Sequence, residues 1–249
     1  MIELQNIRKV FNPGTANQME ALKGVNLNIT AGEFVVIVGA NGSGKTTLLN
    51  IISGSEICTS GKVLIDGNDV TGLPDYRRSR WIARVFQNPL TGTAPDLSIL
   101  DNFRLAAIRT QSKGLRIGVN GNFRKIVKEK IAMLGMGLED KVDREIGALS
   151  GGQRQALTLL MSVMDETKIL LLDEPTAALD PRSAATVMNT AQKLIKDYGF
   201  TSILITHNLK DAHQYGNRLI QMNEGEVIKN LDAATKAKTE LTELFTWFA

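Results

Sequence analysis

The sequence predicts an α/β fold in which helices cover a mostly parallel β-sheet, because short apolar runs alternate with helix-like segments. Three of these runs, residues 33–39, 168–174 and 201–207, are rich in β-branched and aliphatic residues, which is typical of strands buried on both faces. Residues 1–35 alternate short β-like runs with turn residues and predict an N-terminal antiparallel β subdomain. Residues 88–158 are richer in helical patterning, which predicts an α-helical subdomain inserted into this core.

The first half of the chain contains clear turn and helix signals. Pro13 and Gly14 mark a loop or hairpin tip between the first β-like runs. The buried strand at 33–39 is followed by an apolar helical stripe, so a helix is expected over residues 45–53, with Gly54 ending it.

Four further elements complete the predicted fold. Residues 61–70 alternate in polarity like a strand that runs into a turn, and residues 81–87 predict another strand. A helix is expected at residues 182–198, between the last two buried runs. Residues 217–230 predict a hairpin that turns on Asn223-Glu224-Gly225.

The composition is that of a folded chain of low net charge. The 249 residues are 43% hydrophobic and 22% charged, which allows a substantial core and argues against disorder. A formal net charge of +3 is small for a nucleic-acid-binding protein, so no nucleic-acid partner is expected. The single cysteine, Cys58, cannot form an internal disulfide, and no run approaches the roughly 18 apolar residues of a membrane helix. Because a signal-peptide pattern is also missing, we expect a soluble, cytosolic protein.

We expect one domain over residues 1–249. Within it, residues 1–87 and 159–229 would form the β subdomain and the sheet-containing core, and residues 88–158 the helical subdomain. Residues 230–249 are predicted to be an amphipathic helix that docks on its own domain rather than on a partner or a membrane. Its apolar side chains at helical spacing are Leu241, Leu244, Phe245 and Phe248.

A glycine-rich loop between a buried strand and a helix predicts a nucleotide phosphate site. Residues 39–46, GANGSGKT, fit the pattern G-x-x-x-x-G-K-[ST] in the strand-to-helix context that it requires. Backbone N–H groups and the helix N-terminus would bind phosphate, Lys45 adds positive charge, and the Thr46 hydroxyl is the expected Mg²⁺ ligand. The predicted nucleotide-binding residues of this loop are Gly39, Ala40, Asn41, Gly42, Ser43, Gly44, Lys45, Thr46 and Thr47.

Polar residues at the ends of three predicted strands are candidates for catalysis. Asp173 ends an apolar strand and is placed to hold Mg²⁺ through water, and Glu174 to orient a water molecule for attack on the γ-phosphate. Gln87 and His207 end two other strands, and such strand ends meet at the ligand crevice. Either one alone would more often be structural, but their joint placement favours function. The catalytic candidates are Lys45, Gln87, Glu174 and His207, and the metal-binding candidates are Thr46, Gln87 and Asp173.

Two adjacent glycines stand before another predicted helix, in the stretch LSGGQ at residues 149–153. A helix does not need this entrance to fold, so the missing side chains indicate close approach by another group. A helix starting near Gln153 would present its N-terminus to an anion.

Taken together, these motifs resemble the ATP-binding cassette (ABC) ATPases, which power membrane transporters. The resemblance covers essentially the whole chain. It rests on the phosphate loop, Gln87, the LSGGQ signature, the strand ending in Asp173, the D-loop AALD ending at Asp180, and His207, all in family order. It implies a P-loop NTPase (RecA-like) core with ATP and Mg²⁺ as cofactors. It also implies that adenine stacks on Phe11, for which the alternative is a core residue of the first sheet.

The resemblance also implies a head-to-tail homodimer in which the signature of each copy closes over the ATP held by the other. Ser150, Gly151 and Gly152 would bind the γ-phosphate of that ATP, Gln153 would support the closed interface, and Asp180 would couple the two sites. The implied signature residues are Leu149, Ser150, Gly151, Gly152 and Gln153.

Membrane partners are implied as well. A separate transmembrane permease would dock around residues 87–105, which places the ATPase peripherally on the cytoplasmic face of the cell membrane. An extracytoplasmic substrate-binding protein is expected in the same system. The segments 12–22, 92–95, 157–164 and 215–220 together resemble bacterial importer cassettes for amino acids such as tryptophan or tyrosine.

Other functions are weighed against this importer. The alternatives are an ABC exporter or lipoprotein-release ATPase, a soluble ABC protein that acts on DNA or ribosomes, and a P-loop kinase or GTPase outside the family. The signature argues against the last, and the chain has no Asn-Lys-x-Asp element for guanine.

Two basic stretches are expected to be solvated. Residues 76–84 are predicted to form a solvated face, with contact to acidic lipid or the permease as the alternative. Residues 123–130 are expected to form an exposed helix.

Overall fold

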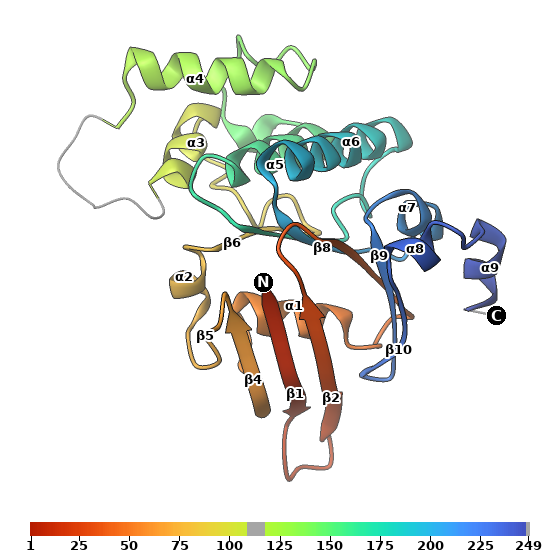
Figure 1. Ribbon diagram of the computed structural model, residues 1–249. Coiled ribbons are helices and arrows are strands. Elements are labelled where there is room, and N and C mark those ends of the chain that lie inside the picture. Colours follow the sequence, from red (N-terminus) through yellow and green to blue (C-terminus); the bar gives the residue numbers. More distant parts are fainter. Residues whose placement is uncertain (109–117, 248–249) are drawn as a thin grey trace.

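Residues 1–108 and 118–247 are described in the computed structural model, and within them the chain forms two β-sheets (Figure 1). The smaller sheet is antiparallel and has the order β2 (Met19–Ile29), β1 (Ile2–Phe11), β4 (Ser60–Ile65) and β5 (Asn68–Asp69). The larger sheet has the order β10 (Glu226–Leu231), β9 (Arg218–Asn223), β3 (Phe34–Val38), β8 (Thr201–Ile205), β7 (Ile169–Asp173) and β6 (Ile82–Val85). All neighbours in it are parallel except β10 and β9, which pair as the predicted hairpin. The predicted α/β fold with an N-terminal antiparallel sheet is confirmed.

Helices lie on both faces of the larger sheet, and α1 lies between the two sheets (Figure 1). Helices α3 to α6 cover the other face, and the last three helices lie beside β9 and β10. In chain order the helices are α1 (Lys45–Ser53), α2 (Asp75–Arg78), α3 (Ile99–Ala107), α4 (Gly121–Ala132), α5 (Gly151–Ser162), α6 (Pro181–Tyr198), α7 (Leu209–Gln214), α8 (Ala233–Lys236) and α9 (Leu241–Thr246), with a 3₁₀ turn at Ile146–Ala148.

The continuous apolar runs are explained by burial on both faces of the larger sheet. Successive side chains of a strand point to opposite faces. In β3, Val35 and Ile37 pack with α1 and the smaller sheet, whereas Val36 and Val38 pack with the helices of the opposite face. The phosphate loop that follows β3 therefore starts from a rigid, fully buried strand.

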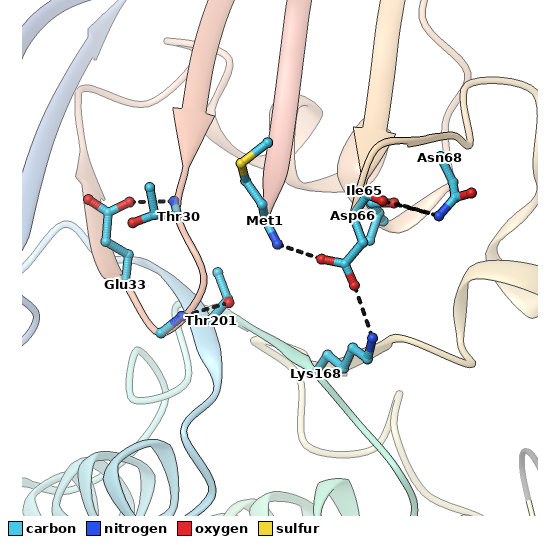
Figure 2. Close-up of polar contacts among 9 residues, drawn as sticks. Met1, Thr30, Glu33, Ile65, Asp66, Asn68, Lys168 and Thr201 are labelled. Carbon is cyan, nitrogen blue, oxygen red and sulfur yellow. Dashed lines mark hydrogen bonds and ion pairs between the residues drawn. The ribbon is translucent and has the colours of Figure 1, made fainter.

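Polar contacts join strand ends of the two sheets (Figure 2). Asp66, in the turn after β4, accepts hydrogen bonds from the α-amino group of Met1 at 2.8 Å and from the Lys168 ammonium group, just before β7, at 3.0 Å. Beside this pair, the backbone N–H of Gly32 donates to the Thr201 hydroxyl at 3.1 Å. These contacts hold the starts of β7 and β8 against the smaller sheet.

The prediction of one helix over residues 230–249 is wrong. Backbone pairing extends β10 to Leu231, which lies opposite Leu219, and two short helices follow instead. Asp232 caps α8 by accepting from the N–H of Thr235. In α9, Leu244 is buried as expected, whereas Phe245 is 54% exposed. Phe248 lies outside the described residues.

Other predicted boundaries agree closely with the structure. Helix α1 ends at Gly54, whose φ of 85° is the left-handed conformation that glycine favours. The division at residues 87, 158 and 229 stays a prediction, and its limit at 158 falls within α5. Among the described residues, no helix is long and apolar enough to cross a lipid bilayer.

Candidate nucleotide site

The phosphate loop joins the carboxyl end of β3 to the N-terminus of α1. Gly44 occupies the N-cap position with a φ of 96°, and no side chain caps the first turn of the helix. The N–H groups of that turn are therefore directed outward without a side-chain acceptor, next to the positive end of the helix dipole. Local geometry thus makes this loop an anion-binding site.

The side chain of Lys45 lies at the base of this loop. Its ammonium group donates to the backbone oxygens of Gly39 at 2.8 Å and Ala40 at 2.9 Å. Burial lowers the pKa of Lys45, and the negative charges of Glu174 and Asp173 oppose that shift. The loop therefore holds one buried cation close to the two carboxylates that end β7.

A cavity of about 320 Å³ opens beside the loop. Such a volume lies within the usual range for small-molecule sites. Phe11 does not line the cavity, but Met19, its cross-strand neighbour on β2, does. One face of the Phe11 ring is covered by the Lys9 ammonium group, 4.8 Å from the ring centre. The lining residues are Met19, Glu20, Ala21, Lys23, Asn41, Gly42, Gly44, Lys45, Thr46, Thr47, Glu174 and Glu224.

Three of the predicted catalytic side chains meet at one oxygen atom. Oε2 of Glu174 lies 3.1 Å from Nδ1 of His207 and accepts a hydrogen bond from Nε2 of Gln87 at 3.4 Å. The backbone of Glu174 has a φ of 44°, a conformation that non-glycine residues seldom adopt. Strained backbone of this kind is common at functional sites. The ends of β6, β7 and β8 thus bring together a cluster that the sequence only placed at separate strand ends.

The side chain that pairs with Asp173 is not among the residues predicted from the sequence. Nη2 of Arg84, from β6, lies 2.6 Å from Oδ2 of Asp173, and the two side chains are 11% and 10% exposed. Nη1 of Arg84 donates to Oδ1 of Asn50 on α1 at 2.7 Å. A charged residue within the otherwise apolar strand of residues 82–86 was the signal that could have revealed this buried pair.

The prediction that residues 76–84 form a solvated face is therefore wrong at two of its arginines. Besides Arg84, Arg78 is fully buried. Its guanidinium group donates to four backbone oxygens, those of Ile51, Ile52, Thr71 and Leu73. The oxygens of Ile51 and Ile52 belong to the last turn of α1, where a cation is favoured by the helix dipole. The predicted helix at 123–130 is present within α4, but only Lys125, Ile126 and Glu129 are exposed, and Val127 is buried.

The signature forms the N-terminus of α5. The helix begins at Gly151 rather than near Gln153, because Ser150 is its N-cap. The Ser150 hydroxyl accepts from the N–H of Gln153 at 3.3 Å, and the Gln153 side chain accepts from the N–H of Ser150 at 3.2 Å. This reciprocal capping box gives both residues a structural role in addition to any role in binding. Leu149 is buried at 7% exposure.

The two signature glycines have different reasons to lack a side chain. A Cβ atom on Gly152 would lie 2.5 Å from Cβ and Oγ of Ser183 on α6, so Gly152 is required by packing within the chain. A Cβ atom on Gly151 would reach only Leu179, at 3.4 Å, and Gly151 is exposed. Only Gly151 therefore leaves room for a group from outside the chain.

This difference predicts unequal effects of alanine. Gly152→Ala is expected to lower the free energy of unfolding by about 1–3 kcal/mol, because the added methyl group overlaps Ser183. Gly151→Ala, the matched control, is expected to change it by less than about 1 kcal/mol. Urea denaturation of both variants measures the difference, and equal losses would contradict the packing argument.

Asp180 also has a structural contact. It is the N-cap of α6, and its Oδ1 accepts from the N–H groups of Arg182 and Ser183, both at 3.1 Å. Ser183, the residue against which Gly152 packs, is thus one turn from this cap. Leu179 of the D-loop lies 3.4 Å from the position of a Cβ atom on Gly151, so the D-loop borders the signature helix within one chain.

The predicted metal ligands are chemically suited to magnesium. Thr46, Gln87 and Asp173 offer oxygen atoms, which Mg²⁺ prefers. Within residues 1–108 and 118–247, no group of three or more His, Cys, Asp or Glu side chains could hold a metal by itself.

A phosphate loop, a neighbouring cavity and the cluster of Gln87, Glu174 and His207 at the ends of parallel strands are typical of a P-loop nucleotide hydrolase. The family model described as ABC transporter matches residues 22–177, more than half of the chain. The chain belongs to the ABC transporter family, and it is an ATPase subunit that binds and hydrolyses ATP.

Relatives of known name include importers and exporters. A tyrosine transport ATP-binding protein of Clostridioides difficile is 38% identical, over 97% of this chain and 95% of its own length. The phosphonates import ATP-binding protein PhnC of Lactobacillus acidophilus is 35% identical, over 98% and 94%. The macrolide export ATP-binding/permease protein MacB of Campylobacter fetus is 36% identical over 98% of this chain, which spans 36% of that longer protein.

Solved structures agree with the fold. The ATP-binding cassette MJ0796, in a dimeric post-hydrolysis state with ADP and Pi, has a TM-score of 0.80 and 33% identity, covering 94% of this chain and 99% of its own. The structure of cbiO1 from Clostridium perfringens, part of an ABC transporter complex, has a TM-score of 0.79 and 27% identity, covering 99% and 93%. ABC ATPases act as dimers together with membrane permeases.

Proposed function

We propose that this chain is the motor subunit of a multisubunit ABC importer for a small solute. The observation that carries this proposal is the convergence of Gln87 and His207 on Glu174, at the edge of the cavity beside the phosphate loop. This arrangement supports a role for Glu174 in the attack on a γ-phosphate held by the loop.

The residues of one copy would divide the work of hydrolysis. The loop N–H groups and Lys45 bind the phosphates, and Phe11 lies beside the adenine, near Met19. Thr46, Gln87 and Asp173 would hold Mg²⁺, which supplies positive charge for the phosphate oxygens. Glu174 orients the attacking water and accepts its proton, while His207 holds Glu174 and contacts the γ-phosphate.

The second half of each site would come from another copy of the chain. Ser150 and Gly151 form an exposed, capped helix N-terminus, and α5 is long enough for its dipole to favour the γ-phosphate of that copy. Gly152 and Asp180 keep α5 and α6 in register behind this surface. ATP binding closes the homodimer, and hydrolysis reopens it.

The permease would dock on the surface around residues 87–105. Two hollows of about 400 and 300 Å³ flank the end of β6. Each has one exposed large side chain in an otherwise mixed lining, Leu105 at 51% in the first and Tyr76 at 69% in the second. We propose that a helix of the membrane partner binds at these hollows, which would hold the ATPase on the cytoplasmic face of the membrane.

Import is proposed from relatives that this chain matches over nearly their whole length. These are a tyrosine transport ATP-binding protein and the phosphonates import ATP-binding protein PhnC. We therefore propose a separate permease, an extracytoplasmic substrate-binding protein, and an amino acid of the tyrosine or tryptophan type as solute.

Reconstitution tests this function. The tagged chain is purified from its native membranes together with its permease, and the complex is placed in liposomes that contain ATP, with the co-purified binding protein added outside. Uptake of labelled tyrosine or tryptophan is expected, and none with the Glu174→Gln complex. ATP-driven movement of solute in the opposite direction would identify an exporter, and recovery without any membrane protein would contradict a role in transport.

A further inference from the structure

Arg84 connects the predicted metal carboxylate to two other parts of the molecule. One nitrogen of its guanidinium group pairs with Asp173 at 2.6 Å and another with Asn50 of α1 at 2.7 Å. The group also lies over the ring of Phe86, 4.7 Å from its centre. The backbone oxygen of Phe86 accepts from Nε2 of Gln155, a fully buried residue of the signature helix α5.

Contacts with Asp173, Asn50 and Phe86 thus fix the position of the Arg84 guanidinium group. Burial of an ion pair is favourable only when the geometry is good, and removal of one partner leaves an uncompensated charge. Among the described residues, the guanidinium group of Arg84 is the cation paired with Asp173. Lys45, the nearby loop cation, instead donates to backbone oxygens.

The charge of Asp173 would oppose nucleotide phosphates bound by the adjacent loop unless a cation compensates it. Mg²⁺ bound with the nucleotide is one such cation, and Arg84 is another that belongs to the chain. Since both act on the same carboxylate, loss of Arg84 removes the ion-pair partner of Asp173 and leaves more of the compensation to Mg²⁺.

We propose that Arg84 is a positioning residue that compensates the charge of Asp173 when magnesium is absent, and so sets how strongly nucleotide binding depends on Mg²⁺. Arg84 keeps the carboxylate paired through its contacts with Asn50 and Phe86. The nucleotide can therefore enter or leave the site without its metal. This role rests on the proposed function of the site, in which Asp173 holds Mg²⁺.

The test is the ratio of two dissociation constants for a fluorescent ATP analogue, measured with excess EDTA and with excess Mg²⁺. Arg84→Met, which keeps an apolar stem and removes the charge, is expected to raise this ratio about tenfold, because only the metal-free complex loses compensation. Arg84→Lys, which keeps the charge, should stay within about twofold of the wild type. Arg80→Met is the matched control, since Arg80 is exposed and lies on the Trp81 ring.

A purely structural role would weaken binding equally in both conditions, so an unchanged ratio in Arg84→Met would overturn the proposal. Should that variant not fold, Arg84→Gln offers a neutral side chain that can still donate to Asn50, and the same rise in the ratio is expected. A wild-type protein that bound nucleotide in neither condition would contradict the proposed function itself. Normal wild-type binding with an unshifted ratio would contradict only the role of Arg84.

Discussion

Glu174→Gln is expected to lower ATP turnover by at least about 100-fold, because the amide cannot accept the proton of the attacking water. The substitution keeps the size of the side chain, so contacts with Gln87 and His207 can persist and ATP binding should be retained. ATP should then hold the variant as a stable dimer, since hydrolysis no longer reopens it. Steady-state phosphate release and gel filtration with ATP measure the two effects.

The control for Glu174→Gln is a variant that removes a carboxylate outside the site. Glu226→Gln, at the exposed start of β10, should keep turnover within about twofold of the wild type, as surface substitutions generally have small effects. A Glu174→Gln variant that stayed monomeric with ATP and hydrolysed it at the normal rate would contradict both the catalytic role and the dimer.

Ser150→Arg is expected to prevent the ATP-dependent dimer while each copy still binds ATP. Ser150 is exposed at the N-terminus of α5, and a long side chain there would fill the space proposed for the γ-phosphate of the other copy. Turnover should fall by at least about 100-fold because the composite site cannot close. Analytical ultracentrifugation with ATP and a phosphate-release assay measure these outcomes.

Ser150→Arg also removes the N-cap of α5, and a second variant separates this loss of stability from the loss of dimerisation. Ser150→Arg loses the cap, which costs about 1 kcal/mol, whereas Ser150→Asp keeps a good cap and places a negative charge toward the phosphate. We therefore expect Ser150→Asp to be as stable as the wild type and still fail to dimerise. Normal hydrolysis by both variants would mean that the signature does not act across the dimer.

A mixture of two defective variants gives the sharpest test of this arrangement. Lys45→Ala damages the phosphate loop and Ser150→Arg the signature. In a head-to-tail pair of one copy of each, the loop of the Ser150→Arg copy meets the intact signature of the Lys45→Ala copy. One site in that pair is therefore complete, and the mixture should regain activity that neither variant shows alone. A mixture as inactive as its components would indicate that each site is built within one chain.

Local sequence patterns determined the elements of the fold and the parts of the site that lie within one short segment. The apolar runs of β3, β7 and β8 are buried on both faces, which leaves few alternatives to a strand, and Gly54 ends α1 as its left-handed conformation requires. The phosphate loop could be recognised because its chemistry is complete between residues 39 and 47. The C-terminal segment was mispredicted because cross-strand pairing at Leu231, rather than side-chain periodicity, sets the end of β10.

Tertiary structure alone decided what depends on neighbours that are distant along the chain. The periodicity of β6 does not reveal that Arg84 faces Asp173, since 89 positions separate the two residues. The sequence likewise cannot distinguish the role of Gly151 from that of Gly152, because the packing of Gly152 on Ser183 depends on how α5 crosses α6. The convergence of Gln87 and His207 on Glu174 follows from the strand order of the larger sheet, which places β6, β7 and β8 side by side. The role of a buried charge or of a missing side chain depends on the atoms packed against it, and only the folded chain brings those atoms together.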